Sequence, residues 1–225
     1  MKATSNLPSL GLLLIAVALP TLALAAERVQ GRSMIMSRHG IVATEHPLAS
    51  QIGATILAQG GNAVDAAIAA NAAMGLVGPM ANGIGGDMFA IVYEAKSGKI
   101  HGLNASGWAP AGLSIELIKR EGFTTNMPQS GIHSVTVPGC VDGWQKLLDR
   151  FGRKKMSALL APSIRLAEEG FPVTEIFSDY WVASEGKLRK DTNAARVYLP
   201  GGRAPKPGEV IRNPDLAWSY KQIAR

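Results

Sequence analysis

The stretch 41–110 constrains the fold of this sequence more than any other part, because four predicted elements follow one another in it with almost no filler. The first is a helix that begins near His46-Pro47, where proline suits the first helical turn. We predict that it ends at Gly60-Gly61, since glycine adopts the left-handed conformation of a helix C-terminus without steric cost.

A second helix, 63–75, follows directly and is built mostly of alanine. Asn62 is its expected N-cap, and Asp65 stands three residues further on as the partner of a capping box. Because small side chains occur on all its sides, this helix can lie close against neighbouring elements. We therefore predict that it forms a buried layer.

A glycine-rich turn, 82–87, leads into two predicted strands, 88–93 and 100–105, which form a hairpin around Gly98. Three glycines before a strand indicate that the backbone comes close to another backbone or to a ligand, and the sequence leaves both readings open. The turn differs from a dinucleotide-binding loop, because its glycines precede a strand and do not join a strand to a helix.

The remaining elements are predicted from periodicity and from capping residues. They are a strand at 41–43, a helix from Ser114, a strand at 133–137, helices at 143–151 and 157–170, a helical segment at 174–196 and a last helix from Asn213. With no internal repeat and no clear linker, helices on both sides of strands indicate a layered α/β (α+β) body.

Composition restricts the function classes. Apolar residues make up 47% and charged residues 18%, which is typical of a packed globular protein. The net charge of +6 is spread along the chain, and the one local basic cluster has no interleaved aromatic residues, so we expect no nucleic-acid partner. That cluster comprises Arg150, Arg153, Lys154 and Lys155.

Residues 1–25 have the pattern of a secretory signal peptide: Lys2, an apolar core too short to span a bilayer, and small residues at 23–25. We expect a mature chain that begins at Ala26 or Glu27, secreted or periplasmic, with no stable membrane insertion after leader cleavage. An uncleaved anchor is the alternative.

The polar residues form no complete catalytic constellation. The four histidines lack metal-ligand spacing, so we expect no metal and no cofactor. Thr124-Thr125 lies in a predicted turn away from any N-terminus and so lacks the α-amine that such a nucleophile uses as base. Cys140 is the single cysteine, which excludes an intrachain disulfide; it is either a small buried residue or a thiol activated by a helix N-terminus.

Several long motifs, in one order, resemble the gamma-glutamyltranspeptidase (glutathione hydrolase) family. They are GGNAVDAAIAANAA, GIGGDMFAIVYEA, VTVPGCVDGWQKLLDRFG, LLAPSIRLAEEGFPVTEIFS and NPDLAWSYKQIA, and together they cover nearly the whole chain after Gly40. The resemblance implies an αββα sandwich of the N-terminal nucleophile hydrolases, incomplete in this chain. By this resemblance, residues 26–225 correspond to the N-terminal portion of the large subunit.

In the family, a precursor cuts itself and frees a threonine at the start of the small subunit, which attacks the γ-glutamyl amide with its own amine as base. The resemblance places that threonine outside this chain, so no catalytic residue is predicted here. The implied partners are the chain's own C-terminal small subunit and a small γ-glutamyl peptide or related amide. We expect residues 1–225 alone to be inactive.

Resemblance also supplies the candidate substrate-binding residues Asn104, Ser106 and Trp108, in the segment Asn104–Pro110. Typical members carry an arginine that binds the substrate carboxylate where Ser106 stands here, and a hydroxyl cannot replace a guanidinium group. All three are equally consistent with ordinary strand-end residues.

Three functions therefore remain open. The first is γ-glutamyl transfer or glutathione hydrolysis. The second is a related acylase acting on a glutaryl or cephalosporin side chain, which the serine favours. The third is a non-catalytic secreted binding module.

Overall fold

The computed structural model describes residues 34–225, so the predicted leader lies outside the described residues. Every element below belongs to the compact unit Arg38–Arg225. The elements in chain order are α2 (Pro47–Ala58), α3 (Ala63–Val77), β1 (Met88–Glu94), β2 (Lys99–Ala105), α4 (Ile115–Arg120), α5 (Cys140–Phe151), α6 (Met156–Glu169), β3 (Phe171–Pro172), α7 (Glu175–Leu188), α8 (Thr192–Tyr198), β4 (Val210–Ile211) and α9 (Pro214–Ile223), with short 3-10 turns at Ile132–Ser134 and Pro200–Gly202.

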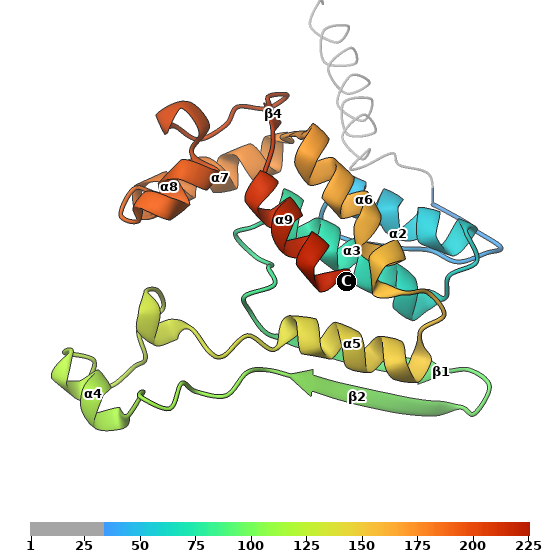
Figure 1. Ribbon diagram of the computed structural model, residues 1–225, viewed down its shortest axis with the longest axis horizontal. Coiled ribbons are helices and arrows are strands. Elements are labelled where there is room, and N and C mark those ends of the chain that lie inside the picture. The colour runs from blue at the N-terminus through green and yellow to red at the C-terminus, as the bar shows by residue number, and fades with distance from the viewer. Residues whose placement is uncertain (1–33) are drawn as a thin grey trace, which may run out of the picture. The chain divides into compact units, whose positions relative to one another are not determined.

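Helix α3 lies at the centre of the helical part, packed against α2, α5 and α6, with α9 beside α6 (Figure 1). Most of its residues are buried, as the alanine-rich pattern predicts, and the exceptions Ala63, Ala67 and Asn71 form one stripe along the helix. The Tyr220 hydroxyl of α9 donates a hydrogen bond to the Ala72 carbonyl at 2.7 Å, which fixes the last helix onto α3.

The predicted capping box of α3 is confirmed. The Asn62 side-chain oxygen accepts from the Val64 and Asp65 N–H groups, and the Asp65 carboxylate accepts from the Asn62 N–H at 2.8 Å. The same fully buried carboxylate also accepts from the N–H groups of Arg153 and Lys154 at 3.0 and 3.1 Å. The Asp65 carboxylate therefore caps α3 and also holds the loop between α5 and α6, which is distant from it in sequence.

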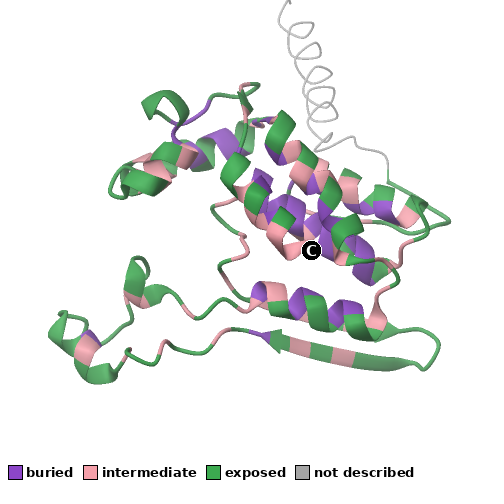
Figure 2. Cartoon of the chain, in the orientation of Figure 1, coloured by how far each residue is buried: buried purple, intermediate pink, exposed green. Residues whose placement is uncertain are grey.

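Strands β1 and β2 form the predicted antiparallel hairpin, with Met88 opposite Ala105 and Glu94 opposite Lys99. Side chains alternate between its two faces. One face packs on the strongly amphipathic helix α5, where Met88, Ala90, Val92 and Leu103 contact the buried cluster that contains Trp144. The other face is solvent-exposed, and in Figure 2 exposed residues (green) alternate with intermediate ones (pink) along β2.

This exposed face corrects one expectation, because within residues 34–225 helices cover the hairpin from one side rather than from both. It carries Phe89, Ile91, Tyr93 and Ile100, with exposed fractions between 65% and 82%. The gathering of four large apolar side chains on one hairpin face is unusual for a surface, since apolar area is normally withdrawn from water.

Two local predictions are also wrong. Segments 41–43 and 133–137 are not strands, because neither has a partner strand; the second begins as the 3-10 turn Ile132–Ser134. The predicted helical structure of 174–196 is confirmed, as two helices, α7 and α8, which are separated where Asp191 accepts from the Ala194 N–H as a new N-cap.

Candidate functional site

The glycine-rich turn approaches other backbone segments at the end of the hairpin. The Gly86 carbonyl accepts from the N–H groups of Gly139 and Cys140 at 3.1 and 3.0 Å, which ties the turn to the start of α5. The Val137 N–H donates to the Trp108 carbonyl at 3.0 Å. Backbone packing therefore involves Gly86, whereas a Cβ built at Gly83 or Gly85 meets no atom within 4 Å.

The segments 105–108 and 137–140 come close together here, and we call this contact the crossing. Two glycines make it possible. A Cβ at Gly107 would lie 1.4 Å from the Val137 carbonyl oxygen, and a Cβ at Gly139 would lie 2.2 Å from the Ala105 carbonyl oxygen. Both distances are far below contact, so a side chain at either position would force the backbones apart.

Asp87 fixes the crossing from its exposed edge. Its Oδ1 accepts from the Gly107 N–H and from the Thr136 hydroxyl, both at 2.9 Å. These two bonds, that from Gly107 first, lower the pKa of the Asp87 carboxyl, with a smaller contribution from the Ser106 hydroxyl. Asp87 is therefore an ionised side chain that joins three segments of the chain.

A concave pocket of about 550 Å³ opens at this crossing. The three candidate residues Asn104, Ser106 and Trp108 all line it, so the structure brings them together. The Asn104 side-chain oxygen accepts from the Ser106 N–H at 2.9 Å, and the Trp108 indole is 86% exposed. The lining also includes Ala105, Gly107, Val137, Pro138, Gly139, Asp142 and Lys146.

The charged groups of this pocket were missed by sequence reasoning. Lys146 and Asp142 lie one turn apart on α5 and pair at 2.6 Å, and neither stands in the resemblance motif around Ser106. Asp87 follows the three glycines directly, and that position was the available signal. Because Asp87 and Thr136 are 49 residues apart, their meeting could not be read from spacing.

Cys140 is 1% exposed, and its thiol donates towards the Asn71 side-chain oxygen at 3.8 Å. Burial, with a smaller contribution from the negative charge of Asp87, raises the pKa of the thiol to about 11. The Trp144 indole N–H also donates to Asn71, at 3.0 Å. The thiol is thus a small buried group, and the alternative of an activated nucleophile does not fit.

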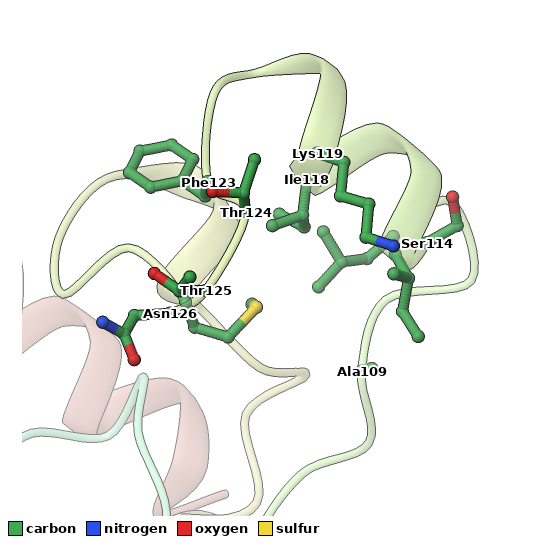
Figure 3. A pocket seen from close by; sticks show the side chains of 11 residues that line it. Ala109, Ser114, Ile118, Lys119, Phe123, Thr124, Thr125 and Asn126 are labelled. Carbon is green, nitrogen blue, oxygen red and sulfur yellow. The ribbon is translucent and has the colours of Figure 1, made fainter.

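A second cavity, of about 350 Å³, lies under α4 in the excursion between β2 and α5 (Figure 3). Its walls are mainly apolar, with Ile118 and Phe123 prominent, and Thr124 and Thr125 lie at its edge. Neither a carboxylate nor an imidazole lines it, so the lining residues give these threonines no such base.

No group of three or more His, Cys, Asp or Glu side chains in 34–225 is arranged to hold a metal ion. Over the same residues, no helix combines the length and the apolar character needed to cross a membrane.

Residues 49–225 match the family model of gamma-glutamyltranspeptidase. This chain belongs to the gamma-glutamyltranspeptidase family. Among curated relatives it is 37% identical to the glutathione hydrolase proenzyme of Bacillus subtilis (strain 168), over 84% of this chain and 32% of that protein. It is 40% identical to the acylase ACY 1 proenzyme of Pseudomonas sp. (strain SE83), over 82% of this chain and 34% of that protein.

Solved structures agree with this assignment. The Helicobacter pylori gamma-glutamyltranspeptidase superposes with a TM-score of 0.80 at 30% identity, over 85% of this chain and 56% of that one. The cephalosporin acylase of Bacillus halodurans superposes with a TM-score of 0.75 at 40% identity, over 87% and 39%. The chain spans about a third of the length of these curated relatives. The family comprises hydrolases and transferases, and the mixed α/β architecture is that of its structural neighbours.

Proposed function

We propose that this chain forms the substrate-binding framework of an exported enzyme that hydrolyses or transfers the γ-glutamyl group of small peptides such as glutathione. The observation that carries the proposal is the family match over 49–225, together with a pocket lined by Asn104, Ser106 and Trp108 at the end of the hairpin. In this proposal the nucleophile is a threonine freed by self-cleavage in further chain, with its own amine as base.

The exposed face of the hairpin supports a partner of that kind. Phe89, Ile91, Tyr93 and Ile100 present apolar area that a second sheet would remove from water, at roughly 25 cal/mol per Å². In our proposal the chain's own small subunit supplies that sheet and completes an αββα sandwich. The hairpin edge and the pocket would then border the same interface.

A related acylase is the second candidate. Ser106 stands where typical family members carry an arginine, and no arginine lines the pocket. A hydroxyl cannot form the bidentate contact that a guanidinium group makes with a carboxylate. Similarity to the Pseudomonas and Bacillus halodurans acylases is as strong as similarity to the glutathione hydrolases, so both substrate classes belong in the test.

The test uses the full gene product, expressed with its leader and purified. Self-cleavage appears as two bands on a denaturing gel, and hydrolysis is followed with γ-glutamyl-p-nitroanilide and glutaryl-p-nitroanilide. Replacing the threonine exposed by cleavage with alanine should abolish both cleavage and turnover, while residues 1–225 alone should be inactive. Turnover of neither amide by the uncleaved or cleaved product would favour the non-catalytic binding module and contradict the proposal.

A further inference from the structure

A further pocket is lined by α7, by α8 and by the loop that follows α3, and we call it the α7–α8 pocket. Its volume is about 340 Å³, and it shares no lining residue with the pocket of Asn104, Ser106 and Trp108. Helices α7 and α8, which supply most of its lining, are neighbours in the fold (Figure 1). A pocket of this size suits one small molecule.

Most of the lining of the α7–α8 pocket is apolar. Trp181 and Leu188 come from α7, Ala194 comes from α8, and Pro79 and Met80 come from the loop after α3. Trp181 is 1% exposed and belongs to a buried core cluster, so it forms a fixed wall. Met80 is 37% exposed, and a methionine side chain adapts its shape to a bound apolar group. The pocket can therefore withdraw an aliphatic side chain from water.

Two opposite charges line the same pocket. Lys187 lies in the last turn of α7, and Asp191 is the N-cap of α8. Within residues 34–225, they form no ion pair with each other or with another charged group. The Asp191 carboxylate is held in place because its Oδ1 accepts from the Ala194 N–H at 2.8 Å. Its second oxygen is therefore available to a charged donor of a ligand.

We propose that the α7–α8 pocket binds a free α-amino acid with an apolar side chain. The α-ammonium group donates to Asp191, the α-carboxylate accepts from Lys187, and the side chain lies against Met80 and Trp181. A simple amine or a simple carboxylic acid would leave one of the two protein charges without a partner. This site is separate from the pocket of the proposed function, and the inference does not depend on that function.

The experiment titrates the full gene product with three probes that share one carbon skeleton. They are L-leucine, 3-methylbutylamine, which lacks the carboxylate, and 4-methylpentanoate, which lacks the ammonium group. Saturation-transfer NMR measures the Kd of each probe. We expect L-leucine to bind about fivefold more tightly than either probe with a single charge, on the order of one exposed ion pair. The difference should shrink as salt is raised, since exposed charges are screened.

Two variants separate the two charges. Asp191→Asn should weaken L-leucine and 3-methylbutylamine about fivefold and leave 4-methylpentanoate unchanged. Lys187→Gln should weaken L-leucine and 4-methylpentanoate to the same extent and leave 3-methylbutylamine unchanged. Asparagine can still accept from the Ala194 N–H as the N-cap of α8, and an unchanged urea midpoint checks that both variants fold as the wild type does. Asp179→Asn and Lys190→Gln are the matched controls, because both residues are exposed and neither lines the pocket.

The crossed pattern of losses in the two variants, with unchanged controls, supports the inference. It is overturned if L-leucine does not bind, if the three probes bind equally, or if fewer than two of the variants lose affinity for L-leucine. Leucine binding that survives in both variants would belong to another part of the molecule and would also overturn it. Because no outcome depends on amide hydrolysis, failure of the proposed function leaves this test intact.

Discussion

Helix α3 and the hairpin β1–β2 follow one another in the chain and are both apolar, yet they have opposite surroundings. The helix is enclosed by α2, α5 and α6, and its alanines let these neighbours approach on most sides. The hairpin is covered by α5 on one face only and exposes Phe89, Ile91 and Tyr93 on the other. Within residues 34–225, the helical core is thus enclosed on most sides, whereas one face of the hairpin is not covered by another element.

The comparison is tested most directly by truncating one apolar side chain in each region. Leu159→Ala should lower the free energy of unfolding by about 3 kcal/mol, because Leu159 is fully buried and leaves a cavity. Ile91→Ala should change it by less than about 0.5 kcal/mol, since Ile91 is 82% exposed. Urea unfolding of residues 1–225 measures both. Equal costs would show that the hairpin face is covered in this chain.

The second largest effect concerns Asp65, a buried polar residue of the enclosed helix α3. Asp65→Asn should cost about 2 kcal/mol, because the new amide presents N–H groups to the N–H donors of Asn62, Arg153 and Lys154. The loss should appear in the urea midpoint and as faster amide hydrogen exchange in the loop after α5. An unchanged exchange rate there would mean that Asp65 caps α3 without holding the loop.

The third prediction concerns the crossing that joins the open hairpin to α5. Gly107→Ala should cost about 1–2 kcal/mol, because its methyl group would overlap the Val137 carbonyl. Gly102→Ala is the control within β2, since no atom lies within 4 Å of a Cβ built there. Heat or urea unfolding compares the two variants. Similar midpoints would contradict the tight crossing.

The smallest effect concerns an ion pair on the surface, between Arg203 and Glu209 in the loop before β4. Arg203 and, to a lesser extent, the Lys206 N–H lower the pKa of the Glu209 carboxyl to about 2. A carboxyl whose pKa is depressed by folding stabilises above its ordinary value of 4.5, and this contribution is lost as pH falls through about 2. Wild type should therefore exceed Glu209→Gln slightly in melting temperature at pH 7, and the two should converge between pH 4.5 and 2. A difference that persists at pH 2 would assign it to another cause.

Separation along the chain explains which residues of the candidate site were found from the sequence and which were missed. Asn104, Ser106 and Trp108 are close in sequence, so a motif places them together, and the structure shows them around one pocket. Lys146 lines that pocket from α5, and Asp87 contacts its lining residue Gly107 from the turn before β1. The predicted strand at 133–137 failed for a related reason, because a strand needs a partner that no local pattern specifies.

The sequence by itself determined the helices, their caps and the hairpin, since these depend on residues within a few positions of one another. Asn62 and Asp65 form their capping box, and the strand alternation places Ile91 on one face. Tertiary structure alone decided that Asp87 contacts Gly107 and Thr136, which are 20 and 49 residues away. It also decided that burial raises the pKa of the Cys140 thiol. Those outcomes depend on how separate elements pack, because hydrogen-bond partners and desolvation are set by whatever lies nearby in space.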